Sequence, residues 1–235
     1  MTGTKDAIRR EMISLRRAVS PLDAEAAERA LVEHVRALAG YRRSSALIAY
    51  AAMDGEVATD RLIRAAFADG KRVFLPVVRG SEMTFAEHRP GAVLTTGRFG
   101  IPEAAGEDWT AAAGSTLALV PLVAWDRDGV RLGRGGGFYD RAFAARGDQP
   151  RGVSADVVLV GLAYAFQQCA KVPRDTWDVL LDWVVCERGP VRCRDGDDRS
   201  PIRKEDTTQH GFFVDCDLLG FGRRAGVRSP ARAPE

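Results

Sequence analysis

The spacing of apolar residues indicates that the chain begins with helices. Near the start, apolar side chains recur three or four positions apart, as on one face of an α-helix: Ile8, Met12, Leu15 and Val19. Ser20 and Pro21 then predict a second helix, because serine is a good N-cap and proline suits the first helical turn. We expect this second helix to run to about Leu38 and to end at Gly40.

After the second helix, strongly apolar runs alternate with helical segments. One such helix should begin at Thr59 and Asp60 and end at Gly70. The runs that predict strands are ALIAYAA (46–52), RVFLPVV (72–78), MTFAEH (83–88), LALVPLVAWD (117–126), VVLVGLAY (157–164) and LDWVVCE (181–187). Pro76 indicates that strand pairing ends there or that the strand lies at an edge. This alternation predicts a Rossmann-like, three-layer α/β/α fold with a mostly parallel central sheet.

The pattern changes after Glu187. Residues 188–235 are rich in Gly, Pro, Arg and Asp and have little periodicity, so we expect most of them to form an irregular, disordered tail. The predicted domains are therefore a folded unit at 1–187, with a basic N-terminal helix, and a tail at 188–235.

Composition narrows the class of protein. The chain has 235 residues, 46% of them hydrophobic, and a formal net charge of +2, which favours a globular protein without a nucleic-acid or membrane partner. The four cysteines lack C-x-x-C spacing and only three histidines are present, so neither a zinc site nor a disulfide scaffold is expected. No signal peptide is evident, and we expect a reduced, cytoplasmic protein.

One segment, RLGRGGGFYDR (131–141), is the strongest indication of chemistry. Four of the five residues from Gly133 to Gly137 are glycine, and the segment follows a strand and precedes an expected helix from Phe138 to Arg146. Glycines allow backbone N–H groups to approach a ligand, and a strand, turn and helix start together can bind an anion. The arginines of this segment would donate hydrogen bonds to phosphate oxygens: Arg131, Arg134 and Arg141.

The known phosphate signatures are nevertheless absent. The dinucleotide pattern fails because Phe138 stands at its third glycine, and the Walker pattern fails because Gly70-Lys71 is followed by Arg72. From these residues alone, a flexible connection remains an equally good interpretation of the loop.

Basic and acidic residues elsewhere are less specific. Lys5, Arg9 and Arg16 share one narrow face of the first helix, which could be a ligand-facing rim or simply a solvated surface. Scattered aspartates are compatible with a nucleotide-bound magnesium ion but do not predict one.

Beyond these patterns, the chain from Lys5 to Glu187 resembles the 5-formyltetrahydrofolate cyclo-ligase family, also called 5,10-methenyltetrahydrofolate synthetases. The strongest marker is RLGRGGGFYDR. The supporting motifs occur in the right order: KDAIRREMISLRRAVS, AMDGEVATD, GRFGIPE, VGLAYAFQQ and VPRDTWDVLLDWVVCE.

The resemblance implies a set of binding residues. ATP would be bound by Lys5, Arg9, Arg131, Leu132, Gly133, Arg134, Gly135, Gly136, Gly137, Phe138 and Tyr139. The folate pocket would be lined by Arg9, Ala51, Glu56, Arg134, Gly135, Gly136, Gly137 and Phe138. Mg²⁺ would be held by Asp140 and Asp178.

Three departures from the family pattern are visible. Some relatives have lysine where this chain has Gly136, and Phe138 replaces a frequent tyrosine. The segment GIPEAA also lacks the proline often found after its glutamate. None of these changes affects Asp140 or Asp178, so activity is expected to survive.

The implied reaction is the ATP-dependent cyclisation of 5-formyltetrahydrofolate to 5,10-methenyltetrahydrofolate, through an imidate phosphate. The sequence does not show the oligomeric state, and we expect a monomer. Arg134 would be the catalytic cation, and no general base is identified. Two alternatives remain: a non-catalytic relative that binds nucleotide or RNA, and an enzyme of similar fold that acts on a phosphorylated sugar or a coenzyme A ester.

Overall fold

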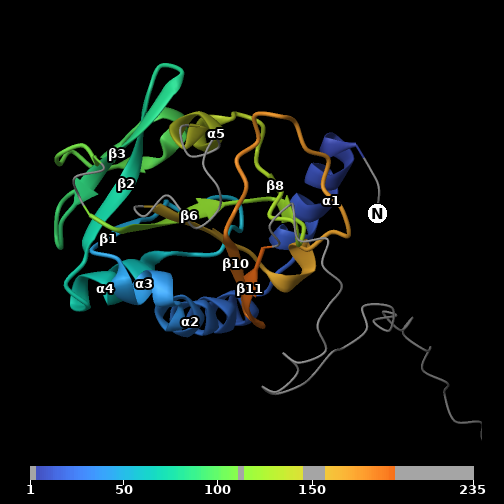
Figure 1. Ribbon diagram of the computed structural model, residues 1–235, viewed down its shortest axis with the longest axis horizontal. Helices are drawn as coiled ribbons and strands as arrows, with labels where there is room; N and C mark the ends of the chain where they lie inside the picture. Colours follow the sequence, from blue (N-terminus) through green and yellow to red (C-terminus); the bar gives the residue numbers. More distant parts are fainter. Residues whose placement is uncertain (1–3, 111–113, 145–156, 194–235) are drawn as a thin grey trace, which may run out of the picture. The chain divides into compact units, whose positions relative to one another are not determined.

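The fold is built around one mixed sheet. A computed structural model describes residues 4–110, 114–144 and 157–193 (Figure 1). Its seven strands lie in the order β11 (Gly189–Arg192), β10 (Trp183–Cys186), β9 (Val157–Leu162), β6 (Thr116–Pro121), β1 (Ala46–Ile48), β2 (Arg72–Arg79) and β3 (Glu82–His88). The inner strands pair in parallel, and each edge strand is antiparallel to its neighbour. The predicted α/β class with a mostly parallel sheet is confirmed.

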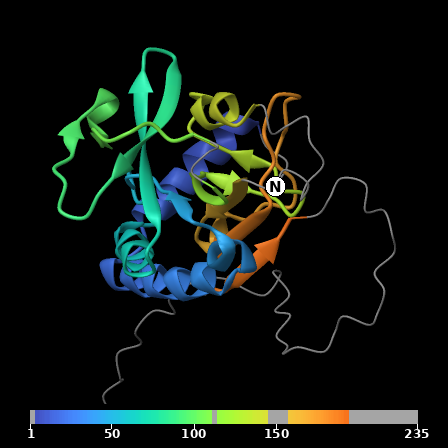
Figure 2. The ribbon, with the colours of Figure 1, turned by 60° about the vertical axis from the view of Figure 1, so that its left-hand side comes forward.

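Helices cover the sheet on both faces. The helices are α1 (Lys5–Arg17), α2 (Pro21–Ala37), α3 (Ala39–Arg43), α4 (Asp60–Ala68) and α5 (Phe138–Ala142), with 3₁₀ turns η1 (Arg98–Gly100) and η4 (Ala165–Gln167). Helices α2, α3 and α4 lie together along one face, and α5 lies on the opposite side beside β3 (Figures 1 and 2). The described residues also form two small two-stranded sheets: β4 (Thr95–Thr96) with β5 (Pro102–Glu103), and β7 (Ala124–Trp125) with β8 (Arg131–Leu132).

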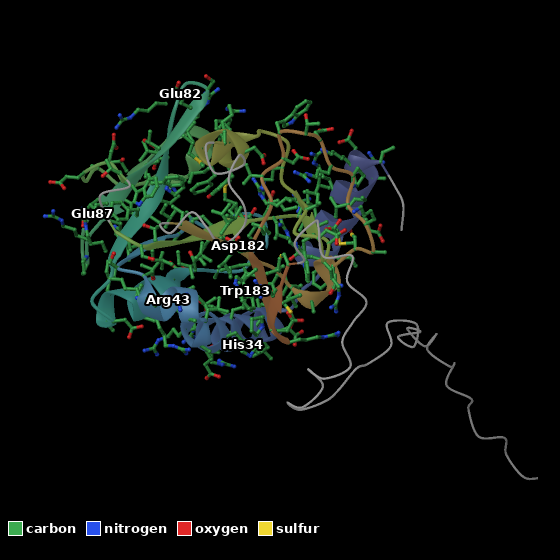
Figure 3. The ribbon with its side chains drawn as sticks, in the orientation of Figure 1. His34, Arg43, Glu82, Glu87, Asp182 and Trp183 are labelled. Atoms are coloured by element: carbon green, nitrogen blue, oxygen red, sulfur yellow. The ribbon has the colours of Figure 1, made fainter. Side chains whose placement is uncertain are left out.

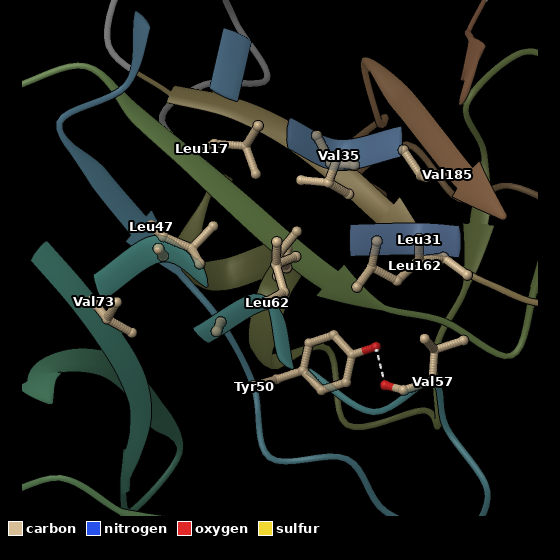
Figure 4. Packing of buried hydrophobic residues seen from close by; sticks show 14 of the residues in the cluster. Leu31, Val35, Leu47, Tyr50, Val57, Leu62, Val73, Leu117, Leu162 and Val185 are labelled. Carbon is tan, nitrogen blue, oxygen red and sulfur yellow. Dashed lines mark hydrogen bonds between the residues drawn. The ribbon is translucent and has the colours of Figure 1, made fainter. Parts of the chain in front are cut away.

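Alternate residues of the inner strands fill separate cores. In β6, Leu117 faces the core beneath α2 and α4, whereas its neighbour Ala118 belongs to the core on the other face. Figure 4 shows Leu31 and Val35 of α2 packed over the first of these cores. On the same side, His34 of α2 lies beside β10, with its Nδ1 3.1 Å from the carbonyl oxygen of Cys186 (Figure 3). This double-sided burial explains why the strands are apolar at nearly every position.

The predicted helix starts are present, but some ends differ. The Ser20 hydroxyl accepts a hydrogen bond from the Asp23 amide at 3.1 Å, and Pro21 occupies the first turn of α2. Helix α2 ends at Ala37, and the chain continues directly as α3, so the expected end at Gly40 is wrong. Within the described residues, no helix is long and apolar enough to cross a membrane.

Several strand boundaries also differ from the prediction. Strands β1, β9 and β10 are shorter than the apolar runs 46–52, 157–164 and 181–187 that predicted them. The run 117–126 is interrupted, because β6 ends at Pro121 and the chain then forms the separate β7–β8 hairpin. Pairing of β2 with β1 ends at Phe74, before Pro76, but β2 continues to pair with β3. The sheet also extends past the predicted boundary at 187 to include β11, and residues 194–235 lie outside the described part of the chain.

Gly161 provides a test of how tightly the core is packed. A Cβ at this position of β9 would lie 2.7 Å from methyl groups of Leu122 and Leu181. Gly161→Ala should therefore lower the free energy of unfolding by about 1–3 kcal/mol through overpacking. Gly40→Ala is the matched control: its Cβ would meet Val158 at an ordinary 3.5 Å, and alanine should add about 0.4–1 kcal/mol. Urea unfolding measures the free energy of unfolding of both variants. Equal changes in the two variants would contradict the tight packing around Gly161.

Candidate functional site

A cavity of about 510 Å³ opens beyond the carboxyl ends of β1 and β6. Its walls come from α1, from the segments that follow these two strands, and from the glycine-rich loop after β8. This is the usual place for a ligand in a parallel α/β sheet.

All the residues that the family resemblance assigns to nucleotide, folate or metal binding line this one cavity. They are Lys5, Arg9, Ala51, Glu56, Arg131, Leu132, Gly133, Arg134, Gly135, Gly136, Gly137, Phe138, Tyr139, Asp140 and Asp178. Because they come from four separate parts of the chain, their assembly depends on the fold, whereas their individual roles stay predictions.

The glycine-rich loop depends on glycine at two positions. Gly135 has φ 103° and Gly137 has φ 63°, a region that side chains other than glycine rarely adopt. The following helix, α5, ends at Ala142, so it is shorter than predicted, and Arg146 lies outside the described residues. Because α5 is so short, its N-terminus cannot be counted as an anion site. The groups that could bind an anion here are the side-chain cations and the backbone amides of the loop.

Arg134 links the glycine-rich loop to the turn after β1. Its guanidinium donates hydrogen bonds to Glu56 at 3.1 Å, to Asp54 at 3.0 Å and to the carbonyl oxygen of Met53 at 3.3 Å. The hydrogen bond from Arg134 holds the pKa of Asp54 below its usual value. Arg134 nevertheless remains partly exposed, so its donors lie at the surface of the cavity.

Helix α1 contributes two more paired cations. Arg9 Nε donates to the carbonyl oxygen of Gly133 at 2.9 Å, which binds α1 to the loop. Lys5 Nζ lies 2.7 Å from Asp175 and 3.2 Å from Asp178. Burial alone would lower the pKa of Lys5, but the hydrogen bonds to both carboxylates outweigh it and raise the pKa. Lys5 is therefore fully charged at neutral pH.

The other two arginines of the loop segment differ in position. Arg131 is buried, and it donates to Asp140 at 2.8 Å and to the carbonyl oxygen of Val179. Arg141 lies outside the cavity lining and donates to the carbonyl oxygen of Ser81 at 3.0 and 3.2 Å. The cavity lining therefore gives no support to Arg141 as a donor to phosphate, and that role stays a prediction.

Arg16 also differs from the prediction. It was expected beside Lys5 and Arg9 at a rim, yet it is only 2% exposed and lies behind the cavity wall. Burial lowers the pKa of Arg16, and the carboxylate of Glu56, 3.8 Å away, partly opposes this shift.

Asp140 and Asp178 could share a metal ion with a ligand. In Asp140, Oδ1 accepts hydrogen bonds from Arg131 and the Val179 amide, and in Asp178, Oδ2 accepts from Lys5 and the Asp175 amide. Each carboxylate thus keeps a second oxygen that accepts no hydrogen bond within the described residues. No group of three or more metal-ligating side chains occurs in that part of the chain. Two carboxylates suit a magnesium ion that takes its other ligands from phosphate and water.

Several lining residues were not predicted from the sequence. An apolar wall is formed by Pro76, Val78, Met83, Phe99, Ile101 and Trp177. Phe99 and Trp177, together with Asp175, fall within the quoted motifs GRFGIPE and VPRDTWD, so those motifs contained a signal for them. The strand residues carried no such signal, because the sequence pattern of inward-facing apolar residues is the same whether they line a cavity or fill a core.

The charged groups of the lining balance one another. Among the described residues, the cations Lys5, Arg9, Arg131 and Arg134 face the carboxylates Glu56, Asp140, Asp175 and Asp178. Four positive and four negative formal charges cancel, and most of these groups are already paired with one another.

Known proteins resemble this chain over most of its length. The model of the 5-formyltetrahydrofolate cyclo-ligase family matches residues 1–187. The 5-formyltetrahydrofolate cyclo-ligase of Haemophilus influenzae is 31% identical over 185 residues, which cover 77% of this chain and 96% of the relative. The Saccharomyces cerevisiae protein of the same name is 28% identical over an alignment that covers 80% of this chain and 98% of the relative. The structure of Aquifex aeolicus 5,10-methenyltetrahydrofolate synthetase matches with TM-score 0.69 at 29% identity, over 87% of this chain and all of that one.

The Arg131–Asp140 pair generates a stability prediction. Asp140→Asn should lower the free energy of unfolding by about 3 kcal/mol, because it leaves the buried Arg131 guanidinium without its counter-charge. Asp175→Asn is the control: its partner Lys5 is more exposed, and the loss should stay below about 1 kcal/mol. Urea unfolding compares the two variants. Similar losses would mean that Asp140 does not compensate Arg131.

Proposed function

This chain belongs to the 5-formyltetrahydrofolate cyclo-ligase family, and we propose that it converts 5-formyltetrahydrofolate and ATP into 5,10-methenyltetrahydrofolate, ADP and phosphate. The observation that carries the proposal is the single cavity that collects every residue matched to the family's binding positions.

The lining of that cavity suits both substrates. Lys5, Arg9 and Arg134 offer donors for phosphate oxygens, and the glycine-rich loop adds backbone amides beside them. The aromatic rings of Phe99 and Phe138 meet edge to face, with centroids 6.2 Å apart, and provide an apolar surface for a flat ring. Glu56 lines the same cavity and accepts hydrogen bonds, as polar groups of a folate would require.

The chemistry needs activation of an amide oxygen, which is otherwise a poor leaving group. The formyl oxygen attacks the γ-phosphorus of ATP, the bond to the bridging oxygen breaks, and ADP leaves. The neighbouring folate nitrogen then attacks the formyl carbon, loses its proton and displaces phosphate together with the former formyl oxygen. Both steps depend on positioning and charge neutralisation rather than on a covalent nucleophile of the protein.

Arg134 is the residue best placed to neutralise the transferring group. It projects from the glycine-rich loop and is partly exposed, whereas Arg131 is buried against Asp140. Arg9 holds the loop from the other side through Gly133 and keeps α1 close to it. These contacts fix the reacting groups of the protein before a substrate enters, which is how positioning lowers a barrier.

A magnesium ion fits the balanced charges of the lining. Asp140 and Asp178 would hold it, and when bound it would neutralise charge on the phosphate oxygens. A bare polyphosphate would meet the four carboxylates of the cavity, whereas a nucleotide with a divalent cation brings both signs of charge. The predicted cytoplasmic location and monomeric state stay predictions.

The proposal is tested by near-ultraviolet absorbance of the methenyl product. The purified protein with 5-formyltetrahydrofolate should give this signal only when ATP and Mg²⁺ are both present, and equimolar ADP should accumulate. Omission of each component and addition of a chelator are the controls. A folded protein that binds ATP but forms no product would contradict the activity and favour the non-catalytic alternative.

A second prediction separates two arginines of the same loop segment. Arg134→Ala should reduce kcat by about tenfold or more, because a cation that faces the transferring phosphoryl group is lost. Arg141→Ala, which removes a guanidinium bound to Ser81 outside the cavity, should leave kcat within about twofold. Steady-state kinetics and the melting temperature are measured for both. Near-normal turnover of Arg134→Ala would remove Arg134 from the mechanism.

A further inference from the structure

Arg16 is an arginine whose burial is not explained by its own hydrogen bonds. Its side chain has 0% exposure, and one nitrogen, Nη1, donates to the carbonyl oxygen of Leu122 at 3.2 Å. The other two nitrogens, Nε and Nη2, have no hydrogen-bond partner within the described residues. Burying a charged group with unsatisfied donors costs stability, so a residue chosen for packing alone would be apolar.

The counter-charge of Arg16 is Glu56, which is itself nearly buried. Arg16 Nη1 lies 3.8 Å from Glu56 Oε1, and the same oxygen accepts the hydrogen bond of Arg134 at 3.1 Å. The other oxygen, Oε2, accepts from the Met53 amide at 3.1 Å. Glu56 thus has one cation behind the cavity wall and another on the cavity surface.

The backbone reinforces this arrangement. Gly55, next to Glu56, has φ 72°, and a Cβ there would lie 3.1 Å from the carbonyl oxygen of Arg16. The turn that carries Glu56 therefore rests directly on the last turn of α1. Any movement of Glu56 toward the cavity would take it away from Arg16, whose charge has no other carboxylate within 4 Å in the described chain.

We propose that Arg16 is a positioning residue that holds the Glu56 carboxylate in place and shares its charge, so that Arg134 can exchange Glu56 for a phosphate oxygen. Without Arg16, Glu56 and Arg134 form a simple ion pair, and binding a phosphate must first break it. This inference rests on the proposed function, because Arg134 and Glu56 are its phosphate and folate groups.

If Arg16 only supported the cavity wall, replacing it would have the same effect on turnover as replacing another buried residue of that wall. Gln167 is a buried side chain that anchors the same wall, since its Nε2 donates to the carbonyl oxygens of Leu122 at 3.2 Å and Val123 at 2.8 Å. Unlike Arg16, it carries no charge and forms no ion pair with Glu56. Gln167→Met is therefore the matched control for loss of a wall contact without loss of a charge, and it also removes the hydrogen bond that Gln167 Oε1 accepts from the Tyr164 amide.

The kinetic test compares three variants by steady-state turnover. Arg16→Met should lower kcat/KM for 5-formyltetrahydrofolate by about tenfold, because Arg134 stays bound to Glu56, and Arg16→Lys should recover it to within about threefold. Gln167→Met should lower the melting temperature but keep kcat/KM within about threefold. Turnover of Arg16→Met within twofold of the unmodified protein, or an equal loss in Gln167→Met, would overturn the proposal.

The stability test does not depend on turnover. Glu56→Gln should lower the melting temperature, because it leaves the Arg16 charge uncompensated, and adding Arg16→Met should restore it. Arg16→Met alone should melt close to the unmodified protein, since Glu56 keeps Arg134. Failure of Arg16→Met to fold, or independent effects of the two changes, would refute the coupling. If the unmodified protein forms no methenyl product, the proposed function fails instead. The double-mutant cycle of Arg16→Met and Glu56→Gln still decides whether the two side chains interact.

Discussion

The site depends on how α1 is held against the rest of the fold. Ile8 and Met12 are buried in a small apolar cluster with Val130, Leu132 and their neighbours, separate from the two cores of the sheet. Leu132 immediately precedes the glycine-rich loop, so the same cluster fixes both the helix and the loop. The distance between the cations of α1 and the loop is therefore set by a few local apolar contacts. The large cores determine the sheet, whereas this third cluster determines the site.

The parts of the fold that could be predicted are those encoded by neighbouring residues. Two signals are local: Ser20 and Pro21 at the start of α2, as N-cap and first-turn residue, and the apolar strands of a doubly covered sheet. The structure contains both. Interruption of the run 117–126 was not predictable, because the chain changes from sheet to hairpin without losing its apolar character. Strand β11 was also missed, since Gly189 and Pro190 suit a tail as well as an edge strand, where proline is tolerated.

The sequence motifs identified which residues form the site, but they did not show which of the nearby charged residues are buried. Spacing by four places Arg16 on the same face as Ile8 and Met12, and the structure buries all three while Leu15 is 44% exposed. The sequence contained this periodicity, yet a charge on an apolar stripe is normally assigned to the rim because burial is costly. Glu56, which arrives from a distant turn, and the carbonyl oxygen of Leu122 offset part of that cost, and neither contact could be inferred from the sequence of α1.

Backbone strain is concentrated around the same cavity. Among the described residues other than glycine, positive φ angles occur at Asp54 and Phe99. Asp54 binds Arg134, and Phe99 lines the cavity against the ring of Phe138. Such conformations cost on the order of 1–3 kcal/mol each and persist where surrounding contacts enforce them. Aspartate tolerates this region, so the bulky Phe99 is the more informative case. Together with the incompletely bonded Arg16, it indicates that this part of the chain is shaped for a ligand at the expense of stability.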